Sequence, residues 1–144
     1  MPKKPPLSSL TSEEYAIRLK RILFSSLGRA WCFWPPRNEV KKRCKVEGKT
    51  GWFKCELCRT EREKIDVDHI KPVIPVSGFT TWDAYIAARF VTADKLQGIC
   101  KDCHQRKTKV ENAQRKINRE LSKIICQHDD SSWCTDKCPK RKKK

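Results

Sequence analysis

Long apolar runs are missing from this chain of 144 residues. No segment approaches the roughly 20 consecutive apolar residues that a helix needs to cross a bilayer. The opening residues, MPKKPPLSSL, lack the apolar stretch of a secretory signal peptide. The sequence also shows no internal repeat. These absences predict a protein that neither spans a membrane nor is secreted.

Acidic residues and core-forming residues are both scarce. Lys and Arg number 33 against 17 Asp and Glu, a formal net charge of +16. This excess predicts a polyanionic partner, most commonly nucleic acid. An anionic membrane surface is the weaker alternative, because the basic segments lack a long apolar face. Hydrophobic residues make up only 38% of the chain, so a small domain here would need additional stabilisation, such as a bound zinc ion.

Cysteine, by contrast, is plentiful, with nine residues in the chain. The count is odd and the first residues show no signal-peptide pattern, which argues against a secreted disulfide framework. Four of the nine fall into C-x-x-C pairs, the spacing of metal-binding knuckles. A reducing, cytoplasmic setting therefore fits the cysteines best.

A capping box at Thr11-Ser12-Glu13-Glu14 predicts the first helix. We expect this helix to end near Leu27, because Gly28 is a stop signal. One side of this predicted helix is an apolar stripe formed by Tyr15, Leu19, Ile22, Leu23 and Leu27. On or near the other side lie the basic residues Arg18, Lys20 and Arg21. The simpler interpretation is a packing element with a solvated basic face, and the alternative is a helix that contacts DNA.

The remaining patterns predict an α+β fold. The expected elements are a short basic helix over 38–45, a strand over 65–68, a helix over 81–90 capped by Thr80, a strand over 96–99 and a long basic helix over 101–125. Core positions rather than base-stacking platforms are expected for the aromatic clusters and their neighbours: Trp31, Phe33, Trp34, Trp82, Tyr85, Ile86 and Phe90. We expect three parts: a basic helical extension over 1–30, a domain over 31–125 and a Cys/His- and Lys-rich tail over 126–144.

Two cysteine pairs predict a structural metal site. Cys55, Cys58, Cys100 and Cys103 form the pattern C-x2-C-x41-C-x2-C. Each pair can turn tightly enough to place two sulfurs on one ion, and four thiolates complete the tetrahedral shell of Zn2+. Such a site has no open position, so its predicted role is structural. The alternative is four unrelated buried cysteines.

An Asp-His step between the two pairs predicts a second, different site. Asp68-His69 lies ten residues after Cys58, and His104 directly follows Cys103. Joining the pairs on one ion would bring these side chains close together. A carboxylate and an imidazole can hold a hard divalent ion such as Mg2+ or Mn2+. A further imidazole can take a proton from an attacking water. A lone Asp-His pair would suggest a structural histidine, but this setting favours a catalytic one.

The segments VDHIKPV and LQGICKDCHQRKT resemble the HNH endonuclease family. The region over 31–112 is similar to small HNH proteins of bacteriophages. The resemblance implies a ββα-metal (HNH) core stabilised by four zinc-binding cysteines. It also implies His69 as general base, with Asp68 and His104 as ligands of the catalytic Mg2+ or Mn2+. The implied partner is DNA, bound at its minor groove by the ββα element, in the cytoplasm of a host cell.

One position departs from the family pattern. The motif's middle asparagine is expected just before the second strand, and Lys95 stands there instead. In the family that asparagine mainly holds the loop that orients the general base. The departure therefore concerns the rate of catalysis more than metal binding. Asp94 or backbone contacts are candidates for holding the loop, and Glu111 and Asn112 are weaker ones. Lys107 is interpreted either as a phosphate contact or as a solvated lysine.

The tail carries a second group of potential zinc ligands. These are Cys126, His128, Cys134 and Cys138, followed by the basic run 140–144. The residue types suit zinc, but the spacing matches no common knuckle, so the alternative is a tail with free thiols. The basic run predicts added, sequence-independent attraction to phosphates.

Three functions are compatible with these patterns. The first is metal-dependent hydrolysis of DNA phosphodiester bonds, as nicking or double-strand cutting. The second is a zinc-stabilised nucleic-acid-binding protein with a weak or inactive nuclease site, which Lys95 favours. The third is an accessory protein that works beside a larger phage complex, such as a DNA-packaging motor, with the tail as its docking element.

Overall fold

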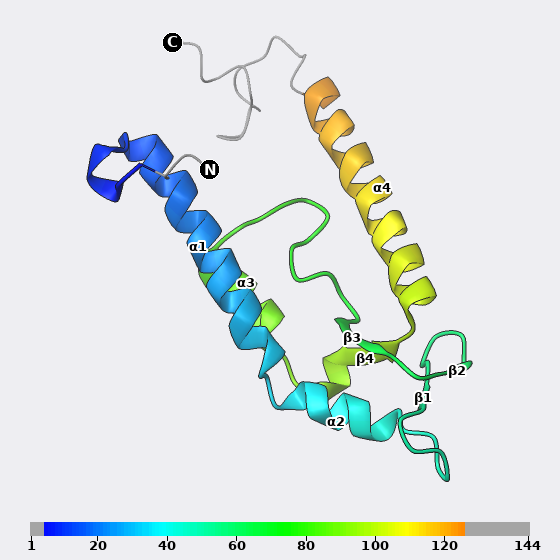
Figure 1. Cartoon of the computed structure of the whole chain (residues 1–144). Coiled ribbons are helices and arrows are strands. Elements are labelled where there is room, and N and C mark those ends of the chain that lie inside the picture. Colours follow the sequence, from blue (N-terminus) through cyan, green and yellow to red (C-terminus); the bar gives the residue numbers. More distant parts are fainter. Residues whose placement is uncertain (1–4, 126–144) are drawn as a thin grey trace. The chain divides into compact units, whose positions relative to one another are not determined.

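The computed structural model describes residues 5–125. The chain divides into two compact units, Met1–Pro35 and Pro36–Lys144, and its elements are shown in Figure 1. The described part contains helices and two small antiparallel sheets, which confirms the α+β class. None of its helices is long and apolar enough to cross a membrane. The predicted tail ligands Cys126, His128, Cys134 and Cys138 lie outside the described residues.

The first unit consists of a short 3-10 helix, η1 (Leu7–Ser9), and one long helix, α1 (Ser12–Cys32). The capping box is confirmed: the Glu14 backbone N–H donates to Thr11 Oγ1, and the Thr11 N–H donates to the Glu14 carboxylate at 2.9 Å. The expected end near Leu27 is wrong, because α1 continues through Gly28. An isolated glycine weakens a helix but does not end it. The helix ends instead just before the Pro35-Pro36 pair.

Several side chains of the apolar stripe of α1 are exposed in the structure. Tyr15, Leu19 and Ile22 keep exposed fractions of 44%, 42% and 48%. Of the neighbouring aromatics predicted as core, Trp31 is buried but Phe33 is 84% exposed, so that prediction holds only in part.

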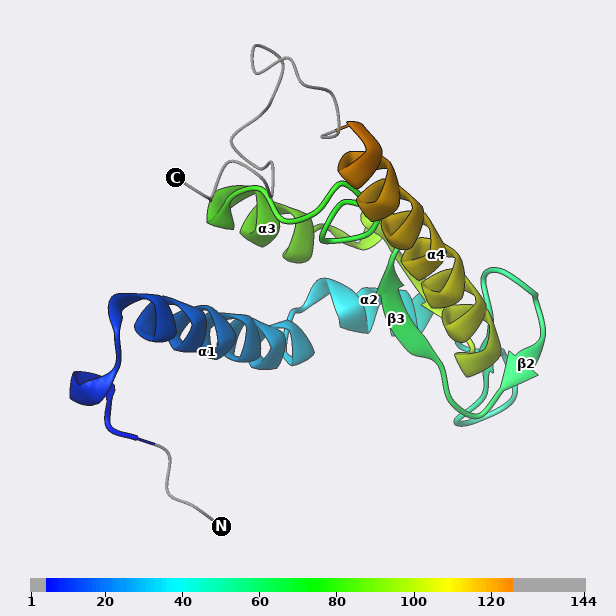
Figure 2. The ribbon, with the colours of Figure 1, turned by 90° about the horizontal axis from the view of Figure 1, so that it is seen from above.

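Within the described residues, the second unit contains three further helices, a short 3-10 helix and four strands. In chain order these are α2 (Pro36–Arg43), β1 (Phe53–Lys54), β2 (Glu61–Arg62), β3 (Asp66–His69), α3 (Trp82–Arg89), η2 (Ala93–Lys95), β4 (Leu96–Ile99) and α4 (Lys101–Ile125). The two antiparallel sheets are β1–β2 and β3–β4. Figure 2 shows α4, which follows β4 directly, beside β3. The predicted bounds of β4 and α4 are confirmed, and β3 is displaced by one residue.

The predicted basic helix over 38–45 begins earlier, at Pro36, and ends at Arg43. Proline is favoured in the first helical turn, where its missing N–H leaves no bond unmade. The helix packs on β4, and Val40 of the helix and Leu96 of the strand are fully buried. Ile99, also fully buried, packs with the cysteines Cys55, Cys100 and Cys103. Arg43 fastens this helix by pairing with Glu56 at 2.9 Å and donating to the carbonyl oxygens of Ala93 and Leu96. This arginine of the predicted basic helix is therefore structural.

Helix α3 is capped by Thr81 rather than Thr80, because the Thr81 hydroxyl accepts from the Ala84 N–H at 3.2 Å. Its aromatic face differs from the predicted one. Tyr85 is buried, but Ile86 is 41% exposed. Trp82 packs edge-on against Phe79 and Tyr85, at centroid distances of 5.1 and 6.0 Å. The core at this helix is thus an aromatic cluster that includes a residue from the preceding loop.

Candidate functional site

The four cysteines of the two C-x-x-C pairs come together in one cluster. Their sulfur atoms all lie within 4.8 Å of one another. Cys55 and Cys58 lie in the turn between β1 and β2, Cys100 follows β4, and Cys103 is in the first turn of α4. A Zn–S distance of about 2.3 Å in a tetrahedron separates sulfurs by roughly 3.8 Å, and the Sγ atoms of Cys58 and Cys100 are 3.7 Å apart. The cluster therefore fits a metal ion such as zinc.

Hydrogen bonds to these sulfurs favour the thiolate forms that a metal requires. The Cys100 backbone N–H donates to Cys55 Sγ at 3.3 Å, and Arg106 donates to Cys103 Sγ at 3.1 Å. The side-chain contact with Thr60 is the main cause that lowers the pKa of Cys58 to about 6. Burial, the largest cause, raises the pKa of Cys103 to about 11, so the thiolate form is not favoured equally at all four cysteines.

Beside this cluster, Asp68 on β3 and His104 on α4 face each other. Asp68 Oδ1 lies 3.9 Å from His104 Nε2. Ligands at opposite sides of a Mg2+ ion with bonds of 2.0–2.1 Å stand about 4 Å apart. The two side chains can therefore contribute two ligands to one small divalent ion. The predicted proximity of these residues is present in the structure.

Asp66 is a functional candidate that the sequence interpretation missed. Its Oδ2 lies 3.0 Å from His104 Nδ1, the ring nitrogen that does not face Asp68. A carboxylate behind a metal-binding histidine fixes the ring and raises its basicity. A signal for this residue was present in the sequence: positions two apart on a strand share a face, so Asp66 and Asp68 must point the same way.

Lys107 occupies the other oxygen of Asp68. Its ammonium lies 2.6 Å from Asp68 Oδ2, 2.6 Å from the His69 carbonyl oxygen and 3.0 Å from Glu111 Oε1. Burial by itself lowers the pKa of Lys107. The hydrogen bonds to Asp68 and Glu111 raise the pKa by more than burial lowers it, so the pKa lies above its ordinary value. Lys107 is therefore a fixed positive charge on Asp68 rather than a solvated lysine.

Glu111 extends these contacts to the loop after β3. It lies 3.6 Å from Arg115, which donates to the Ile74 carbonyl oxygen at 3.1 Å. From the sequence, Glu111 was a weaker candidate for the loop-holding role of the missing motif asparagine. Its place between Lys107 and Arg115 links the Asp68 side of the site to the loop that follows His69.

His69 is held by the end of helix α3. Its Nε2 lies 2.8 Å from the carbonyl oxygen of Arg89, the last residue of α3. The final carbonyls of a helix have no partner within it, so they are available acceptors. In a neutral ring whose Nε2–H donates, Nδ1 carries the lone pair. Burial lowers the pKa of His69, which favours this neutral form.

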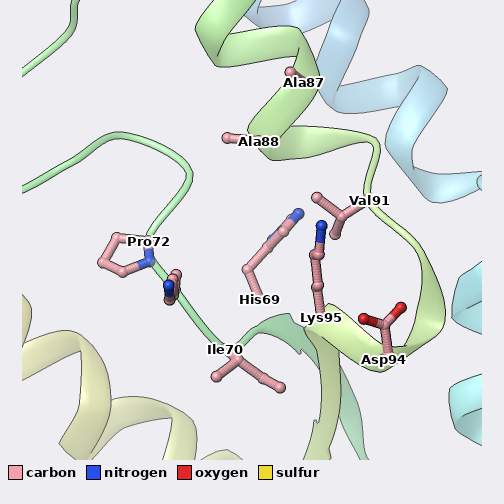
Figure 3. A pocket seen from close by; sticks show the side chains of 9 residues that line it. His69, Ile70, Pro72, Ala87, Ala88, Val91, Asp94 and Lys95 are labelled. Carbon is pink, nitrogen blue, oxygen red and sulfur yellow. The ribbon is translucent and has the colours of Figure 1, made fainter.

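His69 and Asp68 project from opposite faces of β3, because consecutive side chains alternate along a strand. The burial pattern of β3 follows this alternation, with Val67 and His69 buried. Figure 3 shows His69 directed into a cavity of about 460 Å³ that is also lined by residues of α3 and of the segment before β4. The three predicted residues thus form a facing pair and a third side chain across the strand.

Lys95, at the position of the motif asparagine, acts through its backbone. Its carbonyl oxygen accepts from the Ile70 N–H at 3.0 Å, which continues the β3–β4 pairing past His69. Its side chain is exposed and lines the same cavity as His69. Backbone contacts were one of the alternatives considered for holding the loop that orients His69.

Comparisons of the chain with models of protein families, with curated proteins and with solved structures find no match.

Proposed function

We propose that the protein is a metal-dependent endonuclease of the HNH type that hydrolyses DNA phosphodiester bonds. The observation that carries the proposal is the facing pair of Asp68 and His104, 3.9 Å apart beside the four-cysteine cluster. The succession β3, β4, α4, an antiparallel pair followed by a helix, supports a ββα-metal core. The four sulfurs are proposed to hold a structural Zn2+, and Asp68 and His104 a catalytic Mg2+ or Mn2+.

In this proposal each side chain has a distinct task. His69 accepts the proton of the attacking water at Nδ1, and its bond to Arg89 holds the ring in the required tautomer. Asp66 orients His104 from behind. The bound divalent ion would neutralise charge on the phosphoryl and leaving oxygens.

The position of His69 at the end of an edge strand makes this division of tasks feasible. The sheet β3–β4 has only two strands within the described residues, so one edge of β3 faces no other strand. A phosphodiester that approaches this edge at the last residue of β3 can meet Asp68 on one face and His69 on the other. Lys107, bonded to the His69 carbonyl, lies at the same end of the strand.

Affinity for DNA is proposed to come chiefly from charge. The chain carries a net charge of +16. Lysine and arginine contacts to phosphates release counterions, so binding should weaken steeply as salt increases. Such contacts position the nucleic acid without reading its sequence.

The decisive experiment is incubation of the zinc-loaded protein with supercoiled plasmid and Mg2+ or Mn2+. Relaxed or linear product is expected from the wild type and from a Glu63→Gln control, which changes an exposed carboxylate on the segment before β3. The variants His69→Ala and Asp68→Asn should lose cleavage by at least about 100-fold while they keep their zinc and their thermal stability. An uncut plasmid with the wild-type protein would refute the proposal.

A second candidate function is nucleic-acid binding without cleavage. Lys107 favours it, because its ammonium already neutralises Asp68 at 2.6 Å. Under this alternative the wild type binds DNA in a salt-sensitive way, but neither Mg2+ nor Mn2+ yields product. Lys107→Met separates the two candidates further: a nuclease would bind Mn2+ more tightly once the competing charge is gone, whereas a pure binding module would only lose DNA affinity.

A further inference from the structure

The cavity beside His69 has the chemistry of a nucleotide-binding subsite. Its volume of about 460 Å³ lies within the range of small-molecule pockets. Its lining combines three segments of the second unit: the end of β3 and the chain after it, helix α3, and the chain before β4. No role in the proposed hydrolysis requires a cavity of this size.

The lining of the cavity is mixed: five side chains are apolar, and the charged ones are two lysines and one aspartate. The two sets are called here the apolar wall and the charged rim. The apolar wall comprises Ile70, Pro72, Ala87, Ala88 and Val91. The rim carries Lys71 and Lys95, both exposed, and Asp94. Neither lysine ammonium forms a hydrogen bond or ion pair within the described residues. Figure 3 shows His69 and Lys95 extending in the same direction, toward the segment that carries Val91.

We propose that this cavity binds one nucleotide of an unpaired DNA strand, with the base against the apolar wall and its phosphate at Lys71 and Lys95. The two faces of a nucleobase are flat and can pack against apolar side chains, and a phosphate attached to it needs nearby positive charge. A base stacked in a duplex cannot enter a pocket without leaving the stack. The protein should therefore prefer DNA that contains an unpaired nucleotide over a fully paired duplex.

Lys95, which stands in place of the motif asparagine, has a role of its own in this proposed subsite. The loop-holding contact at this position is made by the Lys95 backbone, so the side chain is available for another task. Its ammonium lies on the rim of the cavity that His69 enters. A phosphate bound there would adjoin the end of β3, where the proposed cleavage takes place. The choice of ligand rests on the proposed nuclease function, but its binding can be measured without cleavage.

The test measures binding of dTMP, thymidine and inorganic phosphate to the zinc-loaded full chain without added Mg2+ or Mn2+. The methyl signals of Ala87, Ala88 and Val91 in ¹H–¹³C spectra report directly on the cavity wall. Saturable shifts are expected with dTMP, at a dissociation constant at least tenfold lower than for thymidine or phosphate alone. If inorganic phosphate binds as tightly as dTMP, or if these methyl signals do not move, the inference is wrong.

Variants connect the binding to the rim and the wall. Lys95→Ala should weaken dTMP binding at least fivefold, whereas Lys64→Ala, an exposed lysine that does not line the cavity, should leave it unchanged. Ala88→Leu fills the cavity and should abolish binding. Its folding is verified by the unchanged signals of β4 and α4. Equal loss in the Lys64 variant would overturn the proposed role of Lys95.

A companion measurement separates this inference from the nuclease proposal. Fluorescence anisotropy compares a duplex that carries a single-nucleotide bulge with a fully paired duplex of equal length. The bulged duplex should bind about tenfold more tightly, and Lys95→Ala should remove most of that difference. Equal binding of both duplexes would refute the subsite even if plasmid is cleaved. Selective binding without any plasmid cleavage would refute the nuclease and keep the subsite.

Discussion

Asp66 shows how a single carboxylate can orient a histidine ring, here that of the proposed metal ligand His104. It lies 3.0 Å from the His104 nitrogen that faces away from Asp68. Replacing it with asparagine keeps the size but removes the charge that steadies the ring. We expect Asp66→Asn to weaken Mn2+ binding by roughly 10- to 100-fold, measured by isothermal titration of the zinc-loaded protein.

The matched control for this variant is Glu63→Gln, which removes one exposed negative charge from the same segment. It should leave Mn2+ affinity nearly unchanged. Equal losses in both variants would mean that general electrostatic attraction, rather than the contact with His104, is responsible. Zinc content measured in parallel ensures that the cysteine cluster is intact in each protein.

Gly98 is a residue whose small size is required by its neighbours. A Cβ atom at this position would lie 2.5 Å from Cys44 Sγ and too close to the Ile65 side chain. Both the backbone N–H and the carbonyl of Gly98 are bonded to Glu56. We expect Gly98→Ala to lower the free energy of unfolding by about 1–3 kcal/mol, measured by chemical denaturation.

The environment of Gly98 offers its own control. Cys44→Ala shrinks the side chain that the new methyl group would meet, so the double variant should recover part of the lost stability. A double variant that is destabilised by the sum of the two single changes would argue against the clash. The steric conflict at Gly98 is not visible in the sequence, because it depends on residues 33 and 54 positions away that only the fold brings together.

At the scale of single elements, the capping box of α1 predicts a dependence on pH. The backbone N–H and the hydroxyl of Thr11 both contact the Glu14 carboxylate, and they hold the pKa of Glu14 below its usual 4.5. The stabilisation of the helix start is therefore complete above pH 4.5 and is lost as the pH falls through the lowered pKa. The Thr11 amide proton, followed by NMR, should titrate with a midpoint below 4.5.

Thr11→Ala provides the comparison for this titration. Without the hydroxyl the capping box loses one of its two reciprocal bonds. The midpoint, read from the Glu14 side-chain signals, should then move toward 4.5, and the first turn of α1 should lose helical chemical shifts. An unchanged midpoint would show that the Thr11 hydroxyl does not help to lower the pKa of Glu14, leaving the backbone N–H of Thr11 as the cause.

Elements with strong local signals were predicted well from the sequence. The capping box located the start of α1, and the second cysteine pair located the boundary between β4 and α4. The short strands β1 and β2 were not predicted, since two residues each carry no periodic pattern. The end of α1 was misplaced because Gly28 was given more weight than the proline pair that follows.

At the scale of the whole molecule, the cysteine cluster joins segments that are distant in the chain. If it holds zinc as proposed, removing the metal should unfold the second unit, since a structural site contributes its binding energy to folding. We expect a strong chelator to abolish the dispersed NMR signals of β3 and β4, while the helical signals of α1, in the other unit, persist. Full recovery on adding Zn2+ is the expected control.

The prediction is wrong if the protein, once the chelator has removed its zinc, retains the NMR signals of β3 and β4. In that case the fully buried residues Val40, Leu96 and Ile99 would hold the fold without the metal. Cys100→Ser removes one ligand and should reproduce the effect of the chelator without any added reagent.

The candidate site was only partly predictable from sequence spacing. The clustering of the four cysteines and the approach of His104 to Asp68 follow from the paired spacing. The bond of His69 to Arg89, by contrast, depends on where α3 ends, and the engagement of Lys107 depends on the direction of its side chain. Such contacts between elements require the packed structure.

The cysteine cluster also has a consequence for the order of events during synthesis. Cys55 and Cys100 are 45 positions apart in the chain. At a translation speed of about 5–20 residues per second, the first cysteine pair waits for roughly 2–9 seconds before the second pair is made. During this interval neither the second cysteine pair nor His104 exists. A ribosome-bound chain therefore cannot assemble the proposed active site until α4 has begun to emerge.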